Sequence, residues 1–208
     1  MIDKPSIWLP EMPLVLASKS QTRRELLERA GLHPSIIVPE FDERAFEATL
    51  ERENLAITGR ATALASEKAR LVSLIYPDQY VIGADQMLTC DRVILHKSEN
   101  LVQAKHQLAF LNGKTHQLTS AVSISRNGHI LFTTSDLAHM TMRMLSDQQV
   151  ETYCSLVGSA LYRSVGCYEL EGLGVNLFDR VEGDFFTVLG MPLEPLIGFL
   201  RREGCLSL

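Results

Sequence analysis

Long apolar runs are missing from this sequence of 208 residues, and cysteine is scarce. No run approaches the roughly 20 apolar residues that a membrane-spanning helix needs. Residues 1–11 contain two prolines and no apolar core, so we expect no signal peptide. The four cysteines form no C-x-x-C pair and no zinc-like spacing. These absences predict a cytoplasmic protein that contacts no membrane and keeps its thiols reduced.

Basic residues are in the minority. The chain has 20 lysines and arginines against 25 aspartates and glutamates, for a formal net charge of −5. Surfaces that coat nucleic acid are usually basic, so we expect no nucleic-acid partner. A small polyanionic substrate suits such a chain if cations gather locally and a divalent metal cation, Mg²⁺ or Mn²⁺, adds positive charge.

Internal repeats, low-complexity segments and interdomain linkers are also absent. With 46% hydrophobic and 22% charged residues, the composition is that of an ordinary globular protein. The length suits one domain, with two lobes about a cleft. We therefore expect a single domain over residues 1–208, in which residues 1–12 form an N-terminal extension.

Several familiar catalytic motifs do not occur. Residues 14–31, in which a strand leads into a helix, contain neither the Gly-Lys-Ser/Thr of a P-loop nor the G-x-G-x-x-G dinucleotide fingerprint. The sequence also lacks the H-E-x-x-H of zinc proteases and the G-x-S-x-G elbow of serine hydrolases. The chemistry must therefore be sought in residues outside these motifs.

The most informative stretch runs from residue 14 to residue 31. The apolar segment Leu14–Ala17 predicts a short buried strand. A helix follows, for which Ser20 is a suitable N-cap and Gly31 a suitable C-terminal stop. The stretch therefore predicts a strand, a tight turn and a helix.

Cations crowd the first turn of this helix. Lys19, Arg23 and Arg24 lie at the end where the helix dipole is already positive, which disfavours cations. Together with the hydroxyls of Ser18 and Ser20 and the free backbone N–H groups, they form a typical anion site. We therefore predict that this turn binds the phosphates of a substrate.

An alternative interpretation of the same residues is purely structural. Arg24 would pair with Glu28 one turn further on, and Arg23 would point into water. Surface pairs of this kind are common and contribute about 0.3–0.5 kcal/mol. The sequence alone leaves both interpretations open.

A second stretch, Tyr80–Asp85, is an apolar strand that runs directly into a carboxylate. The carboxyl ends of strands are where open α/β sheets place their chemistry, so Asp85 is a candidate functional residue. Gly83 and Ala84 keep the approach narrow, and Gln86 adds a second polar group. The alternative is that Asp85 merely caps a turn.

Three further charged residues are candidates because of their positions. Glu43 follows the short strand Ser35–Val38, where ligand-handling loops are common. Lys68 lies beside the small-residue face of a long helix, so its ammonium can extend towards a cleft. Lys97 lies on a loop after a predicted hairpin. The alternatives are a solvated turn for Glu43 and an exposed outer helix face for Lys68.

Other local signals lie towards the C-terminus. Asn127-Gly128 is a strong hairpin signal, and Ser146 with Gln149 has the spacing of a capping box. Residues 181–189 are typical of a turn followed by a strand. Pro192 begins a final predicted helix.

Taken together, these blocks resemble the Maf family from about residue 13 to residue 204. The matching blocks are Leu16-Ala-Ser-Lys-Ser-x-x-Arg-Arg-x-Leu-Leu27, Asp42-Glu43, Leu64-Ala-x-x-Lys-Ala69, Gly83-Ala-Asp-Gln86, Lys97, Glu171-Gly172-Leu-Gly174 and Leu189-Gly-Met-Pro-Leu193. The resemblance implies an α/β fold like that of inosine triphosphate pyrophosphatases, with a mixed twisted sheet, flanking helices and two lobes around a deep cleft. It also implies a homodimeric, metal-dependent nucleoside triphosphate pyrophosphatase, which hydrolyses the α–β anhydride to a nucleoside monophosphate and pyrophosphate.

The resemblance also implies roles for individual residues. The substrate-binding positions are Ser18, Ser20, Arg23, Arg24, Lys68 and Lys97. Asp85 matches the catalytic carboxylate, and Glu43 and Asp85 would hold the metal. Whether Asp85 orients or deprotonates the water, or holds the metal that does so, is left open. Thr22, Gln86 and Glu171 match the positions that set specificity.

Glu171 favours one branch of the family. It stands where the branch acting on dTTP and UTP has Gln, and the segments around it look more like the 7-methyl-GTP branch. A carboxylate suits guanine because it accepts hydrogen bonds from N1–H and N2–H₂. The alternatives are a dTTP/UTP pyrophosphatase, a phosphomonoesterase, and a non-catalytic nucleotide-binding regulator of cell division or septum formation.

Overall fold

The computed structural model describes residues 6–208 and contains two compact units. The first unit comprises Met1–Asp85, Ser120–Asp136 and Gly190–Leu208, and the second comprises Gln86–Thr119 and Leu137–Leu189. Three long strands contribute residues to both units: β3 (Val81–Cys90), β5 (Thr115–Arg126) and β6 (His129–Met142). Each unit therefore contains part of the same sheet.

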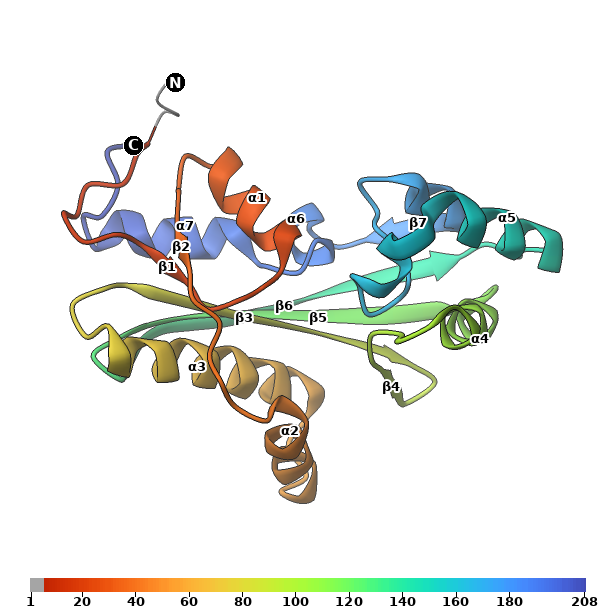
Figure 1. Ribbon diagram of the computed structural model, residues 1–208, viewed down its shortest axis with the longest axis horizontal. Helices are drawn as coiled ribbons and strands as arrows, with labels where there is room; N and C mark the ends of the chain where they lie inside the picture. Colours follow the sequence, from red (N-terminus) through yellow and green to blue (C-terminus); the bar gives the residue numbers. More distant parts are fainter. Residues whose placement is uncertain (1–5) are drawn as a thin grey trace. The chain divides into compact units, whose positions relative to one another are not determined.

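The sheet is mixed (Figure 1). Its order is β2-β1-β3-β5-β6-β7, and β4 pairs with β3 outside this path. The shorter strands are β1 (Val15–Leu16), β2 (Ser35–Ile36), β4 (Val93–Leu95) and β7 (Phe178–Glu182). β1 runs parallel to β2 and β3, whereas β4 is antiparallel to β3 and β7 is antiparallel to β6. The predicted α/β fold with a mixed sheet is confirmed, and the cleft between two lobes stays a prediction.

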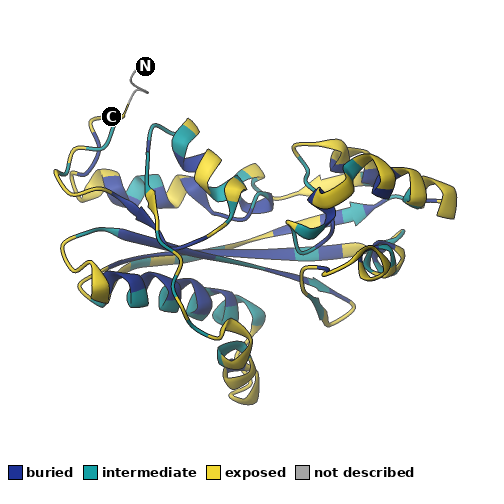
Figure 2. Cartoon of the chain, viewed as in Figure 1, coloured by how far each residue is buried: buried dark blue, intermediate teal, exposed yellow. Residues whose placement is uncertain are grey.

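The first unit is layered around its part of the sheet. Its helices are α1 (Gln21–Arg29), α2 (Glu43–Arg52), α3 (Ile57–Ile75) and α7 (Leu193–Arg202). Helix α3 lies along one face of the strands, with α1 and α7 on the other (Figure 1). Ala69 and Val72 of α3 are fully buried against Val15 and Val81 of the strands. Figure 2 shows this buried stripe along α3, which the small-residue spacing predicted.

The second unit has its own core. Its helices are α4 (Leu101–Leu111), α5 (Asp147–Val157) and α6 (Phe185–Val188), with the 3₁₀ turns η1 (Gly158–Tyr162) and η2 (Leu173–Leu177). Leu88, Leu108 and Met140 are fully buried in this core. The rings of Tyr168 and Phe178 meet edge to face with centroids 4.7 Å apart. Within residues 6–208, no helix combines the length and the apolar character needed to cross a membrane.

The local signals give mixed outcomes. Asn127 and Gly128 form the predicted hairpin turn with φ of 50° and 75°, and the capping box of Ser146 with Gln149 is present. The strand predicted within residues 181–189 is wrong. The strand β7 ends at Glu182, and Asp184 then caps helix α6 by accepting a hydrogen bond from the backbone N–H of Thr187. This side-chain cap competes with extended backbone and starts a helix instead.

Candidate functional site

The predicted turn between β1 and α1 forms as expected. Ser20 is the N-cap of α1, and its hydroxyl accepts a hydrogen bond from the backbone N–H of Arg23. The hydroxyl of Ser18 accepts a hydrogen bond from the backbone N–H of Ser20 at 3.3 Å. Both predicted hydroxyl ligands therefore lie at the N-terminus of α1, where the helix dipole favours an anion.

Arg23 points into the protein and not into water. Its Nε donates to the carbonyl of Gly190 at 3.0 Å, and its Nη1 donates to the carbonyl of Ala84 at 2.8 Å. The same Nη1 donates to the Ser18 hydroxyl at 3.2 Å. Burial lowers the pKa of Arg23, and the negative charge of Asp85 opposes that shift. The structural alternative for Arg23 is therefore wrong.

Arg24 differs from its neighbour. Its Nε lies 2.7 Å from Glu28 Oε1, in the i,i+4 ion pair that the structural alternative predicted. The Arg24 side chain is about half exposed, at 48%. Thr22 lies between Gln21 and Arg23 in the same first turn and is partly buried. The two adjacent arginines therefore occupy different environments.

Lys68 joins the two predicted carboxylates. Its ammonium nitrogen lies 2.7 Å from Glu43 Oε2 and 2.8 Å from Asp85 Oδ1. The Lys68 and Asp85 side chains are 9% and 13% exposed, whereas Glu43 is 50% exposed. Two carboxylates from α2 and β3 therefore converge on one buried cation of α3.

The close packing of α3 on β3 makes this contact reachable. A Cβ added to Gly83 would lie 2.1 Å from the carbonyl oxygen of Ala65 and 2.6 Å from the backbone nitrogen of Ala69. Only a residue without a side chain tolerates such an approach. Gly83 thereby brings the backbone of α3 against β3 in the same helical turn that carries Lys68.

The sequence predicted that the strand ends at Asp85, and this prediction is wrong. Strand β3 continues for five residues to Cys90, because Leu88, Thr89 and Cys90 pair with β4. Asp85 therefore lies within a ten-residue strand and not at its carboxyl end. Strand β3 pairs with β1 before Asp85, at Val81 and Ile82, and with β4 after it, which suits a fixed functional group.

Glu43 and Asp85 are the candidate ligands of a divalent metal. Among residues 6–208, no group of three or more His, Cys, Asp or Glu side chains is arranged to hold a metal ion. Glu43 and Asp85 do converge on the same point, the Lys68 ammonium. Magnesium is commonly held by one or two carboxylates together with substrate phosphates. The donor set therefore fits a metal that arrives with its nucleotide, and not a resident metal cage.

The remaining predicted residues belong to the second unit. Gln86 donates from Nε2 to the carbonyls of Thr187 and Val188, at 3.2 and 3.0 Å. Lys97 and Glu171 are exposed on loops. The first unit thus brings together Ser18, Ser20, Arg23, Glu43, Lys68 and Asp85, while a common site with the residues of the second unit stays a prediction.

Sequence reasoning missed the role of Gly190 and the backbone contacts of Arg23. Gly190 lies 167 positions from Arg23 in the chain, so no local pattern joins them. The only available signal was the block Leu189-Gly-Met-Pro-Leu193, which carried the family resemblance without a role. The carbonyl of Ala84 likewise has no sequence signature.

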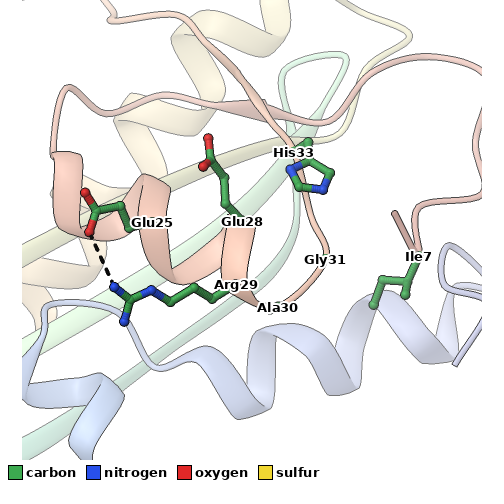
Figure 3. A pocket seen from close by; sticks show the side chains of 7 residues that line it. All are labelled: Ile7, Glu25, Glu28, Arg29, Ala30, Gly31 and His33. Carbon is green, nitrogen blue, oxygen red and sulfur yellow. Dashed lines mark ion pairs between the residues drawn. The ribbon is translucent and has the colours of Figure 1, made fainter. Parts of the chain in front are cut away.

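A hollow of about 480 Å³ lies beside the C-terminal half of α1 (Figure 3). Its lining residues are Ile7, Glu25, Glu28, Arg29, Ala30, Gly31 and His33. Glu25 and Arg29 form an ion pair at 4.0 Å across one side of it. None of the predicted site residues lines this hollow, so it is separate from the candidate site.

The fold and the charge cluster together define an α/β protein with a cationic helix start beside a lysine-bridged carboxylate pair. The model of the family described as "Maf-like protein" matches residues 13–203. This chain belongs to the Maf family.

Curated relatives cover almost the whole chain. A protein of Nitrobacter hamburgensis named "Nucleoside triphosphate pyrophosphatase" is 47% identical over 98% of this chain and 100% of its own length. A protein of the same name from Bradyrhizobium diazoefficiens is 42% identical over 97% of this chain and 98% of its own length. A protein of Brucella abortus named "7-methyl-GTP pyrophosphatase" is 44% identical over 93% of this chain and 98% of its own length.

Proposed function

We propose that this chain is a nucleoside triphosphate pyrophosphatase that hydrolyses the α–β phosphoanhydride to a nucleoside monophosphate and pyrophosphate. The observation that carries the proposal is the contact of Lys68 with both Glu43 and Asp85, while the partly buried guanidinium of Arg23 contacts the carbonyl of Ala84 next to Asp85. The names of full-length relatives support the same reaction. The enzyme would be a hydrolase acting on phosphoanhydrides.

The phosphates need positive charge and hydrogen-bond donors. The start of α1 supplies backbone N–H groups and the hydroxyls of Ser18 and Ser20. Within residues 6–208, the three contacts of the Arg23 guanidinium come from Nε and Nη1, and the two N–H donors of Nη2 would serve a phosphate oxygen. Arg24 would have to leave Glu28, at a cost of only about 0.3–0.5 kcal/mol for such a surface pair. Lys97 would add a further cation from the second unit.

The transition state of phosphoryl transfer needs charge neutralisation and positioning more than covalent help. Asp85 would act on the attacking water, either directly as a base or as a ligand of a divalent cation. Glu43 and Asp85 would hold Mg²⁺ or Mn²⁺, and such an ion supplies charge neutralisation and a more acidic water. Lys68 would hold Asp85 in place and face the phosphates.

The base preference would come from Thr22, Gln86 and Glu171. A carboxylate at position 171 suits the N1–H and N2–H₂ edge of guanine, which a pyrimidine does not offer. The name of the Brucella abortus relative supports 7-methyl-GTP as one substrate. We further propose that the enzyme works in the cytoplasm as a homodimer without nucleic-acid or membrane partners.

The decisive experiment measures pyrophosphate and phosphate release from GTP, 7-methyl-GTP, UTP and dTTP, with Mg²⁺, with Mn²⁺ and with a chelator. Metal-dependent release of pyrophosphate together with nucleoside monophosphate is the expected result. Orthophosphate as the first product would identify a phosphomonoesterase instead. Nucleotide binding without turnover under all conditions would support a non-catalytic regulator and overturn the proposal.

A further inference from the structure

A cluster of polar side chains in the second unit contacts the residues on either side of Lys97. Gln107 of α4 donates from Nε2 to the carbonyl of His96, at 2.6 Å. On the other side of Lys97, the hydroxyl of Ser98 lies 3.1 Å from the sulfur of Cys167. The Cys167 thiol in turn donates to Oε1 of Gln107 at 3.3 Å. The two residues that flank Lys97 are therefore fixed to the same pair, Gln107 and Cys167.

We call this cluster of Ser98, Gln107 and Cys167 the clamp. Ser98 is 4% exposed and Cys167 is fully buried, so water does not replace their contacts at low cost. Burial raises the pKa of the Cys167 thiol, which keeps it protonated and able to donate. The thiol donates to Gln107, so the Ser98 hydroxyl donates to the sulfur, and each polar group of the clamp has a partner.

The backbone at Cys167 is unusual. Its φ is +60°, in the left-handed region that residues other than glycine and asparagine rarely adopt. The Cys167 carbonyl also accepts a hydrogen bond from the hydroxyl of Tyr153, at 3.1 Å. A strained conformation persists only where surrounding contacts hold it, and such positions gather at functional sites.

Cys167 lies in the loop that carries Glu171, between the 3₁₀ turns η1 and η2. The next residue, Tyr168, is fixed by a 2.7 Å contact between its hydroxyl and Nε2 of His116. Glu169 is held by Arg163, with 2.8 Å between Oε1 and Nε. The loop is therefore fixed at three consecutive residues before it reaches the exposed Glu171.

We propose that the clamp is a positioning element that sets Lys97 and Glu171 in one arrangement, so that the cation for the phosphates and the carboxylate for the base act on the same nucleotide. This inference rests on the proposed function. Lys97 and Glu171 would touch the substrate, whereas Ser98, Gln107 and Cys167 act through them. Loosening the clamp then weakens nucleotide binding and base preference while the chemical step is largely retained.

The test compares three substitutions of Cys167. C167A removes the thiol contacts but leaves the left-handed strain, whereas C167G removes both, because glycine adopts positive φ without strain. C167S keeps a donor and acceptor and should restore most of the wild-type behaviour. Cys154 is similarly buried, in α5, and lies outside the clamp, so C154A is the matched control.

For C167A and C167G we expect KM to rise about tenfold and kcat to fall by less than about threefold. The ratio of kcat/KM between the best and the poorest of the four nucleotides should fall about tenfold as well. C154A should lower the melting temperature without changing KM or this ratio. A lower melting temperature for C167A and C167G with unchanged KM and unchanged base preference would overturn the proposal.

A second substitution keeps the test independent of the folding of any one variant. S98A should reproduce the effect of C167A, and the double variant should add little to either one, because both break the same contact. Fully additive effects would overturn the proposal. If the wild-type protein binds nucleotides but releases no pyrophosphate, the proposed function fails, and the dissociation constant of GTP for C167A against wild type then decides on the clamp. Weaker binding supports it, and equal binding overturns it.

Discussion

In the first unit the predicted site residues contact one another, whereas in the second unit residues outside the predicted site fix the segments that carry Lys97 and Glu171. Lys68 contacts Glu43 and Asp85 directly, and Arg23 contacts Ser18. Lys97 and Glu171 instead lie exposed on loops whose neighbouring residues are fixed by the clamp and by the pair of His116 with Tyr168.

This difference suits two different tasks. Chemical steps need groups held on rigid elements within fractions of an ångström, and Asp85 and Lys68 lie inside a strand and a helix. Recognition of a base tolerates side chains that move when the ligand arrives. Changes at Asp85 and Lys68 should therefore mainly affect kcat, and changes at Lys97 and Glu171 should affect binding and base preference.

The largest effect is expected for D85N. The amide keeps the size of the side chain but removes the charge that we propose acts on water or metal, so turnover should fall by two or more orders of magnitude. Pyrophosphate release measures turnover, and a thermal unfolding curve checks that the variant folds. Near-normal turnover in a well-folded D85N sample would remove the first unit from the chemistry.

The next effect concerns the stability of the second unit at acid pH. Burial lowers the pKa of His116 to about 4, and Nδ1 of this ring has no hydrogen-bond partner within residues 6–208. In the unfolded chain the pKa of a histidine returns to about 6.5. The unfolded chain therefore binds more protons between these values, and stability that is complete above about pH 6.5 is lost as the pH falls towards 4.

The lost stability amounts to about 3 kcal/mol for a shift of this size. Urea unfolding at pH 7.5, 5.5 and 4.5 measures it. Carboxylates titrate in the same range, so H116Q is the control, because it keeps a polar group beside Tyr168 but does not titrate. The wild type should lose more stability than H116Q on acidification, and parallel curves for the two proteins would contradict the prediction.

A third prediction tests the packing that brings α3 to Asp85. In G83A the new methyl group would meet backbone atoms of Ala65 and Ala69, so α3 has to shift. The expected cost is about 1–3 kcal/mol of unfolding free energy, and turnover should fall because Lys68 moves with the helix.

Gly198 provides the matched control for G83A. It lies within α7, and a Cβ there would meet only the far end of Arg202, at 3.6 Å. G198A should therefore stabilise the protein by about 0.5–1 kcal/mol through helix propensity. Equal losses in both variants would show that the approach of α3 to β3 is not close enough to matter.

These examples also show which features a sequence can predict. The strand, turn and helix around Ser18 and Ser20 were predictable because apolar runs, caps and misplaced cations are local signals. The face of α3 that is lined by small residues was predictable from the helical spacing of those residues. The same spacing predicted the position of Lys68 beside this face. The capping box at Ser146 followed from two residues three positions apart.

The features that sequence reasoning missed depend on contacts between distant residues. The sequence left open that the Arg23 side chain points into water, but its guanidinium donates to the carbonyls of Ala84 and Gly190. Every residue has a backbone carbonyl, so no sequence motif indicates which carbonyls accept these hydrogen bonds. The clamp is hidden for a similar reason, because Cys167 contacts Ser98 across 69 positions of chain. Tertiary contacts of this kind have to be observed.

The smallest of these effects is expected for R23K. Its comparison with R24K contrasts two neighbouring arginines within the first unit. Lysine keeps the positive charge, but one ammonium cannot donate in a planar fork to the carbonyls of Ala84 and Gly190 and to the Ser18 hydroxyl. Since Ala84 precedes Asp85, its carbonyl contact fixes the backbone beside Asp85, the carboxylate that we propose acts in the chemical step. We expect kcat to fall about tenfold, or about 1.4 kcal/mol, with KM nearly unchanged.

Arg24 is the matched control, because R24K keeps the charge and still allows an i,i+4 pair with Glu28. Its kcat should change by less than about twofold, since the Arg24 guanidinium pairs with the side chain of Glu28 and the Arg24 side chain is about half exposed. Steady-state kinetics of both variants under identical conditions measure the difference. If R23K and R24K lose the same amount of kcat, the two arginines supply charge alone, and the buried contacts of Arg23 do not position Asp85.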